Sequence, residues 1–190
     1  MQLIGLTGTH GAGKGTVSDY LVREHGFVCV SVSEFLADEA VHRGVKPDRR
    51  ARGDIANEYR VHGPTALMEA TFASIPAGSE RVILEPQYTE AEVAFVHAKG
   101  GIVIAVDADL RTRYDRVHLR GSAKDDVSFE QFVALEELTS EDKDKQNVRA
   151  AIEAADIQLM NTGTLQELEA AVREALDERR ILIDVDTDVD

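Results

Sequence analysis

The sequence is poor in cysteine, lacks tryptophan and contains no long hydrophobic run. Cys29 is the one cysteine among 190 residues, so no disulfide can form within the chain. We expect Cys29, which falls in the apolar run FVCVSV, to be a buried small side chain of a protein in a reducing compartment. No apolar run approaches the roughly 18 residues that a membrane span needs, and the opening MQLIGLTG shows no basic signal-peptide segment. The sequence therefore predicts a cytoplasmic protein with no membrane partner.

Basic residues are also scarce. Lysine and arginine number 21 against 35 aspartate and glutamate residues, which gives a formal net charge of −14 at pH 7. This balance argues against a nucleic-acid partner, because binding a phosphate backbone needs a basic surface. It remains compatible with a small anionic ligand, since a local group of arginines can outweigh the electrostatic field of the protein's net negative charge. We expect the partner to be a small-molecule nucleotide or a phosphorylated metabolite, and the sequence leaves a monomer and a homodimer both open.

Short apolar runs alternate with longer amphipathic stretches along the chain. The pairs are LIGLT with VSDYLVREH, FVCVSV with EFLADEAVHR, RVILE with EAEVAFVHAK, GIVIAV with DLRTRYDRVHLR, and DIQLM with LQELEAAVREAL. Such alternation predicts a parallel sheet of five strands, because parallel neighbours need intervening crossover helices. Strands that are apolar throughout fit a sheet covered on both faces. We predict a three-layer α/β domain that binds its ligands beyond the carboxyl ends of the strands.

Two charged helical stretches interrupt this alternation, at about residues 48–74 and 128–154, and both could cover the strand ends. The closing ILIDVDTDVD alternates apolar and acidic residues, so it could be an edge strand or a frayed end. The predicted parts are one domain over residues 1–180, an acceptor-binding insertion at about 33–76, a short lid at about 121–137 and an acidic tail over 181–190.

A glycine-rich loop follows the first predicted strand. In GTHGAGKGT the spacing G-x-x-x-x-G-K is satisfied by Gly8, Gly13 and Lys14. Glycines let backbone N–H groups point inward, and the helix that opens at Lys14 adds positive potential, so the loop can hold phosphates. The usual pattern continues with a hydroxyl that meets Mg²⁺, whereas this chain has Gly15 there and the hydroxyl at Thr16. The predicted phosphate-binding residues are Gly8, Gly11, Ala12, Gly13, Lys14, Gly15 and Thr16.

The GAGKGT ending resembles that of the adenylate kinase and nucleoside monophosphate kinase family within the P-loop fold. The resemblance implies ATP and Mg²⁺ as cofactors, with the metal held largely through waters and carboxylates. It also implies that Thr16 contacts the α- and β-phosphates, close to the metal. One departure is His10, where the family usually has proline, and we expect it to be a loop residue near solvent.

The segment SVSEFLADEAVHRG resembles the start of the acceptor-binding region of that family. It makes Ser33 and Glu34 candidate acceptor contacts, although a helix N-cap at Ser33 and an acidic first turn would be enough to explain both. The family's arginine on that helix, roughly at Ala37, is missing. A second candidate group lies in the densest cationic stretch of the chain, where Arg52, Asn57 and Arg60 can share part of one helix face.

Guanidinium groups suit bidentate phosphate binding, so this cluster is the predicted binding site of the acceptor phosphate, with solvated salt bridges as the alternative.

The third strand ends in Glu85-Pro86-Gln87-Tyr88. A carboxylate leaving a strand beside the phosphate loop can hold Mg²⁺, which makes Glu85 the candidate metal residue together with Thr16. The resembling kinases have Asp-Gly and then an arginine here, so Gln87 and Tyr88 would supply neutral contacts to the acceptor.

The stretch after the fourth strand, VDADLRTRYDRVHLRG, resembles the lid entry of dephospho-coenzyme A kinases. Arg116 and Arg120 lie four apart on one helix face, where they would neutralise charge that develops on the transferring phosphate. Arg113 is expected to be an ordinary helix residue. Asp109 looks like the cap of this helix, and Asp107 is a weaker candidate for a water-mediated metal contact.

The stretch MNTGTLQELEAAVREAL resembles the closing portion of the same kinases, whose Asn-x-Gly lies beside the donor adenine. The resemblance makes Asn161 and Gly163 candidate nucleotide-binding residues, mainly through their backbone, and Thr164 should cap the last helix.

The sequence thus predicts an ATP-dependent phosphotransferase that moves the γ-phosphoryl group to a small phosphorylated acceptor such as a nucleoside monophosphate. A dephospho-coenzyme A kinase or other small-metabolite kinase is an alternative, favoured by the missing acceptor arginines. A regulatory nucleotide-binding protein that hydrolyses ATP slowly is an alternative of another class.

Overall fold

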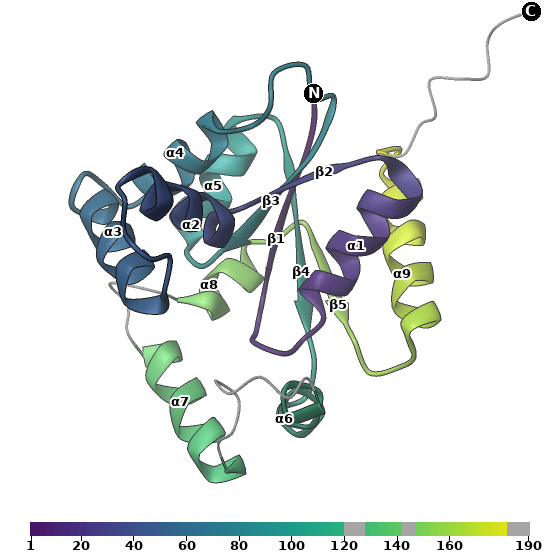
Figure 1. The fold of residues 1–190 in the computed structure, drawn as a ribbon. Coiled ribbons are helices and arrows are strands. Elements are labelled where there is room, and N and C mark those ends of the chain that lie inside the picture. The colour runs from purple at the N-terminus through teal and green to yellow at the C-terminus, as the bar shows by residue number, and fades with distance from the viewer. Residues whose placement is uncertain (120–127, 142–146, 182–190) are drawn as a thin grey trace, which may run out of the picture.

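The protein is built on a single parallel sheet. A computed structural model describes residues 1–119, 128–141 and 147–181 (Figure 1). The five strands run in the order β2-β3-β1-β4-β5, and all of their pairings are parallel. This confirms the predicted five-stranded parallel sheet. The strands are β1 (Gln2–Gly8), β2 (Val28–Ser31), β3 (Arg81–Gln87), β4 (Ile102–Asp107) and β5 (Ile157–Met160).

Helices cover both faces of this sheet (Figure 1). One face carries α1 (Lys14–His25) and α9 (Leu165–Glu178), which pack against each other. The opposite side carries α2 (Val32–His42), α3 (Arg49–Val61), α4 (Ala66–Ala73), α5 (Glu90–Ala98) and α8 (Val148–Glu153). Beyond the carboxyl end of β4 lie α6 (Leu110–Leu119) and α7 (Phe129–Glu141) (Figure 1).

Two hydrophobic clusters fill the space between the three layers. Ile4 and Ile83 point into the cluster beneath α1 and α9, whereas Leu3 and Val82, their strand neighbours, point into the cluster beneath α2, α4 and α5. Successive side chains of a strand face opposite sides of the sheet. Both sides are buried here, which is why these strands are apolar at consecutive positions.

Helix caps fix where the chain leaves the strands. Thr164 caps α9 in a capping box with Glu167, which confirms the prediction for that residue. Asp109 Oδ1 accepts a hydrogen bond from the Thr112 backbone N–H at 2.9 Å, as expected of a cap. The prediction for Ser33 as an N-cap is wrong: β2 ends at Ser31, and Ser31 Oγ accepts from the Ser33 N–H at 3.1 Å. The helix therefore begins directly after the strand, and Ser33 lies within its first turn.

The two charged helical stretches each form a pair of helices. The first contains α3 and α4, and the second contains α7 and α8. At the end of the described chain, the Ile181 carbonyl accepts from Gln2 Nε2 at 2.8 Å, and residues 182–190 of the predicted tail lie outside the described residues. Among the helices described, none combines the length and the apolar character needed to cross a bilayer.

Candidate functional site

The loop between β1 and α1 has backbone conformations that only glycine adopts readily. Gly8, Gly11 and Gly13 have φ angles of 139°, 81° and 113°. A Cβ atom added at Gly8 would lie 1.9 Å from the Val106 carbonyl oxygen on β4, and one added at Gly13 would lie 2.5 Å from Asn161 Nδ2. The loop is therefore pressed against its neighbours, and its glycines are required by space as well as by φ.

Lys14 holds a positive charge over this loop. It is the first residue of α1, and its Nζ donates to the carbonyl oxygens of Gly8 at 2.8 Å and Thr9 at 2.9 Å. The first turn of α1 contains no acidic residue, so the positive end of the helix dipole is not neutralised from within the helix. The loop, the lysine and the helix end together form a site for an anion.

A cleft of about 700 Å³ opens beside the loop, at the carboxyl ends of β1 and β4. Gly8, Thr9 and Lys14 line it from the loop side. The rest of the lining comes from the ends of β3 and β4 and from α6, α7 and α8, and its polar residues are Tyr88, Asp107, Arg113, Glu136, Arg149 and Glu153. The cleft thus brings two arginines into the same cavity as the lysine of the loop.

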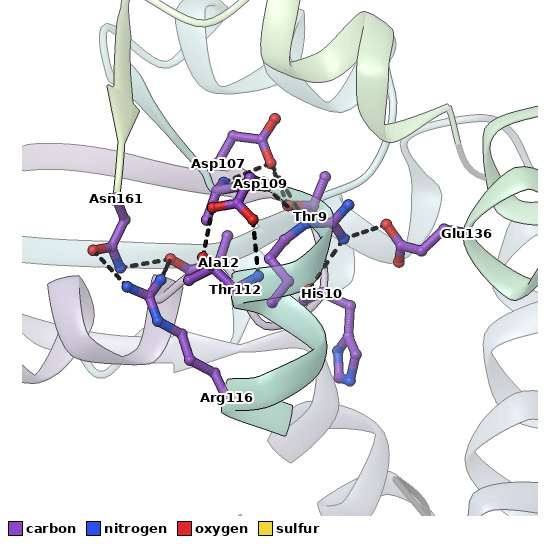
Figure 2. Close-up of polar contacts among 12 residues, drawn as sticks. Thr9, His10, Ala12, Asp107, Asp109, Thr112, Arg116, Glu136 and Asn161 are labelled. Atoms are coloured by element: carbon purple, nitrogen blue, oxygen red, sulfur yellow. Dashed lines mark hydrogen bonds and ion pairs between the residues drawn. The ribbon is translucent and has the colours of Figure 1, made fainter. Parts of the chain in front are cut away.

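Asp107 links β4 to the loop. Its Oδ1 accepts from Thr9 Oγ1 at 2.5 Å and from the Ala108 backbone N–H at 2.8 Å (Figure 2). The Asp107 carboxylate was a weak candidate for a metal contact, and its hydrogen bonds show that it also orders the start of the loop. Thr9 carried no sequence signal apart from its place inside the glycine-rich pattern.

Arg116 lies on the other side of the loop from the cleft. Its Nη1 donates to the Ala12 carbonyl at 3.5 Å and its Nη2 to Asn161 Oδ1 at 3.2 Å, while Asn161 Nδ2 donates to the same Ala12 carbonyl at 2.8 Å (Figure 2). Arg116 and Asn161 line a second cavity of about 340 Å³ together with Thr16 and Gly163. The candidate nucleotide-binding residues Thr16, Asn161 and Gly163 are therefore brought together.

The expectation that Arg116 neutralises the transferring phosphate does not match this position, because Arg116 faces the second cavity and does not line the cleft. Its predicted companion Arg120 lies outside the described residues, as does the start of the predicted lid, residues 121–127. The cleft arginine of α6 is instead Arg113, which is buried although it was expected to be an ordinary helix residue.

Glu85 lies at the end of β3, one strand away from the loop. Burial raises the pKa of its carboxyl group, against the opposing effects of the Cys29 thiol and the Lys14 charge. Within the described chain its Oε2 is buried without a hydrogen-bond partner. A buried carboxylate oxygen left unpaired beside the phosphate loop fits a cation or the water bound to one.

Cys29 is half-buried, and burial raises the pKa of its thiol to about 11, so it stays protonated at neutral pH. No group of three or more His, Cys, Asp or Glu side chains is placed to hold a metal within residues 1–119, 128–141 and 147–181.

The predicted acceptor cluster does not reach the cleft. Arg52 Nη1 donates to Ser33 Oγ at 2.9 Å, and Arg60 Nη1 donates to Asn57 Oδ1 at 3.2 Å. Both pairs are exposed on α2 and α3, and none of the four residues lines the cleft. Glu34 lines a separate cavity of about 360 Å³ beside β2.

The two residues after Pro86 have different environments. The side chain of Gln87 is fully buried, its Nε2 donates to the Leu84 carbonyl at 2.8 Å, and its backbone carbonyl accepts from Thr7 Oγ1 at 2.7 Å. It is a core residue that ties β3 to β1, so the prediction of an acceptor contact through its side chain is wrong. Tyr88 does line the cleft, and burial together with the nearby Glu92 raises the pKa of its hydroxyl.

Arg149 is the second cleft arginine that sequence reasoning missed. It lies on α8, is exposed, and makes no hydrogen bond or ion pair with another residue of the described chain. The sequence signal that could have found it is an isolated arginine in a helix following the predicted lid, in a protein with few cations.

The strand order and the phosphate loop at the end of β1 define a P-loop protein with a kinase-like fold. The chain belongs to the AAA domain family AAA_18, whose profile matches residues 4–144. This confirms the resemblance of the sequence to the P-loop nucleoside monophosphate kinase family.

Relatives cover almost the whole chain. It is 29% identical over 177 residues to a UPF0200 protein of Hyperthermus butylicus, covering 92% of each chain. It is 27% identical over 183 residues to a UPF0200 protein of Methanosarcina mazei, covering 93% of this chain and 94% of that protein.

Solved structures show the same fold. TT1252 from Thermus thermophilus matches with a TM-score of 0.60 and 23% identity, covering 93% of this chain and 96% of that one. Shikimate kinase from Aquifex aeolicus matches with a TM-score of 0.57 and 16% identity, covering 95% and 99%. At such identities the likeness concerns the fold alone.

Proposed function

We propose that the protein is an ATP-dependent phosphotransferase that moves the γ-phosphoryl group of ATP to a small phosphorylated acceptor, a nucleoside monophosphate. The observation that carries this proposal is the set of cations around the cleft, which is lined by Lys14 at the loop, by Arg113 of α6 and by Arg149 of α8. Phosphoryl transfer depends mainly on positioning two anionic partners and on neutralising charge between them. A cleft lined by cations from three different elements suits that task.

The donor would lie across the loop. Its phosphates would be held by the backbone of residues 8–16 and by Lys14, and its base would enter the cavity lined by Arg116, Asn161 and Gly163. Thr16 lines that cavity as well, so we assign it to the phosphates nearest the nucleoside rather than to a metal. Mg²⁺ would neutralise the phosphates when bound, and Glu85 would hold it, directly or through water.

The acceptor would occupy the cleft beside Tyr88. Its phosphate would meet Arg149, whose guanidinium has no competing partner among the described residues. The aromatic ring of Tyr88 and the apolar side chains of Leu110 and Ile152, which line the same cleft, would cover a base or another flat group.

A small-metabolite kinase with a neutral hydroxyl acceptor is a second candidate. One observation favours it: Arg52 and Arg60, the arginines expected to grip an acceptor phosphate, bond to Ser33 and Asn57 outside the cleft. A coupled assay of ADP release with each nucleoside monophosphate, dephospho-coenzyme A, shikimate or no acceptor separates the two candidates. The proposal expects fast release with one monophosphate, and slow release that is the same with every acceptor and without one would refute both kinases.

A further inference from the structure

Arg113 is the most enclosed cation of the cleft. It is 7% exposed, it lies on α6, and it lines the cleft beside the phosphate loop. A guanidinium buried to this degree needs partners for its charge and for its N–H groups. The N–H groups that take no part in these contacts show where Arg113 can still bind a ligand.

The hydrogen bonds of Arg113 use two of its three guanidinium nitrogens, Nε and Nη1. Nε donates to the Ala108 carbonyl at 3.0 Å, and Nη1 donates both to the His10 carbonyl at 3.3 Å and to the carboxylate of Glu136. Asp107 Oδ1 lies 4.0 Å from Nε. None of the bonds made by the described residues uses Nη2, and Arg113 lines the cleft, so two N–H donors remain for a ligand there.

The guanidinium of Arg113 also contacts an aromatic ring. Arg113 lies over the ring of Phe132 on α7, 5.8 Å from its centre, and the Phe132 side chain is 4% exposed. The same ring packs against His10 of the loop at 6.4 Å. The loop, α6 and α7 therefore meet at one place, and Arg113 is the charged group at that junction.

Glu136 is an anion in a cleft suited to anions. It lines the same cleft as Lys14, and its carboxylate pairs with the Nη1 group of Arg113. A phosphate entering the cleft would be attracted by the arginine and repelled by this carboxylate. Because a nucleotide's terminal phosphate carries more charge than a carboxylate and accepts from a guanidinium in bidentate fashion, it can displace Glu136.

We propose that Arg113 binds the terminal phosphate of the donor nucleotide through its Nη edge, and that Glu136 is the counterion it gives up when that phosphate arrives. This assignment rests on the proposed function of the same cleft and adds a residue to it. The consequence is that nucleotide binding changes the contacts of α7, because the ligand breaks the ion pair between Arg113 and Glu136 that links α7 to the loop in the free protein.

The test is equilibrium binding of ADP and of the non-hydrolysable β,γ-imido analogue of ATP, both with Mg²⁺, measured by calorimetry. Glu136→Gln should bind the triphosphate analogue about tenfold more tightly, which corresponds to about 1.4 kcal/mol of relieved repulsion, and should bind ADP as the unaltered protein does. Glu130→Gln is the matched control, because it removes the same charge from the exposed first turn of α7, and it should change neither affinity. Arg113→Lys should weaken binding of the triphosphate analogue alone, since lysine keeps the positive charge but cannot donate two parallel hydrogen bonds from one planar group.

Each outcome has a defined meaning. Unchanged or weaker triphosphate binding by Glu136→Gln would overturn the assignment, because the pair would then be purely structural. If the unaltered protein bound neither nucleotide, the assignment and the proposed function would both fail. If the expected binding pattern appeared but no acceptor were phosphorylated, the phosphotransferase proposal would fail while the assignment of Arg113 stood.

Discussion

Replacement of Gly8 by alanine should disrupt the junction on which the whole site is built. The added Cβ would lie 1.9 Å from the Val106 carbonyl oxygen, well inside the 3.0 Å within which real Cβ atoms essentially never approach a neighbour. That oxygen belongs to the backbone of β4, and Gly8 pairs with Val106 in the sheet, so no flexible side chain can move aside. The φ of 139° adds a conformation that alanine avoids.

The magnitude follows from these two causes. Backbone strain of this type costs about 1–3 kcal/mol, and forcing an atom into a packed contact costs about 1–3 kcal/mol more. The free energy of unfolding should therefore fall by about 2–6 kcal/mol, a large share of the about 5–15 kcal/mol of an ordinary domain.

Urea unfolding analysed by linear extrapolation measures this difference. Gly15→Ala is the matched control just beyond the loop, because Gly15 lies in the first turn of α1 and a Cβ there meets nothing within 4 Å. It should leave the stability unchanged or raise it by up to about 1 kcal/mol, as alanine does in a helix. A Gly8→Ala protein within about 0.5 kcal/mol of the unaltered one would refute the close approach of the loop to β4.

Three further perturbations test other contacts. Asn161→Ala removes the amide that donates to the buried Ala12 carbonyl, so it should lower the free energy of unfolding by about 1–3 kcal/mol and weaken nucleotide binding. Asn57→Ala, whose hydrogen bond is exposed on α3, is the control and should do neither. Equal effects of the two substitutions would contradict the role of Asn161. Arg149→Ala should raise the KM for the acceptor by about tenfold or more, because a charged contact is lost. Arg52→Ala should leave this KM nearly unchanged, and initial rates measured over a range of acceptor concentrations test both expectations. Burial alone would raise the pKa of Asp156, but hydrogen bonds from the Val103 backbone N–H and from His97 outweigh it and lower the pKa. A lowered pKa in the folded state means that the ionised group stabilises the protein above the unfolded-state pKa of about 3.9 and that this contribution is lost as the pH falls through the folded-state pKa. Asp156→Asn should therefore be less stable than the unaltered protein at pH 7, with a gap that closes below about pH 4, and a gap independent of pH would count against this linkage.

The donor side of the site was predictable because its chemistry is local. Four closely spaced glycines, a lysine and a helix start lie within residues 8–16, so their order in the chain determines their geometry. Asn161 was found through the resemblance of its segment to the closing portion of small kinases, and it directly follows a strand whose end must lie near the loop in a parallel sheet.

The cleft walls were not predictable in this way. Whether Arg113 or Arg116 faces the cleft depends on how α6 is rotated about its axis, which is set by its packing against α7 and the loop and not by residue spacing. Gln87 appeared polar and accessible in the sequence, yet its amide finds a backbone carbonyl in the core. The arginines of α3 were predicted to bind a phosphate because several lie close together in the sequence. Their spacing in the sequence does not determine which cavity the helix faces.

The central claim is that this chain transfers a phosphoryl group from a nucleotide held over Lys14. The most direct measurement is mass-spectrometric detection of the phosphorylated acceptor after incubation with ATP, Mg²⁺ and an equal mixture of nucleoside monophosphates, comparing the unaltered protein with Lys14→Ala. Loss of the lysine contact should slow transfer by several powers of ten, each worth about 1.4 kcal/mol of barrier. A new diphosphate product that disappears in Lys14→Ala is the predicted result. Formation of that product at the same rate by both proteins would contradict the account.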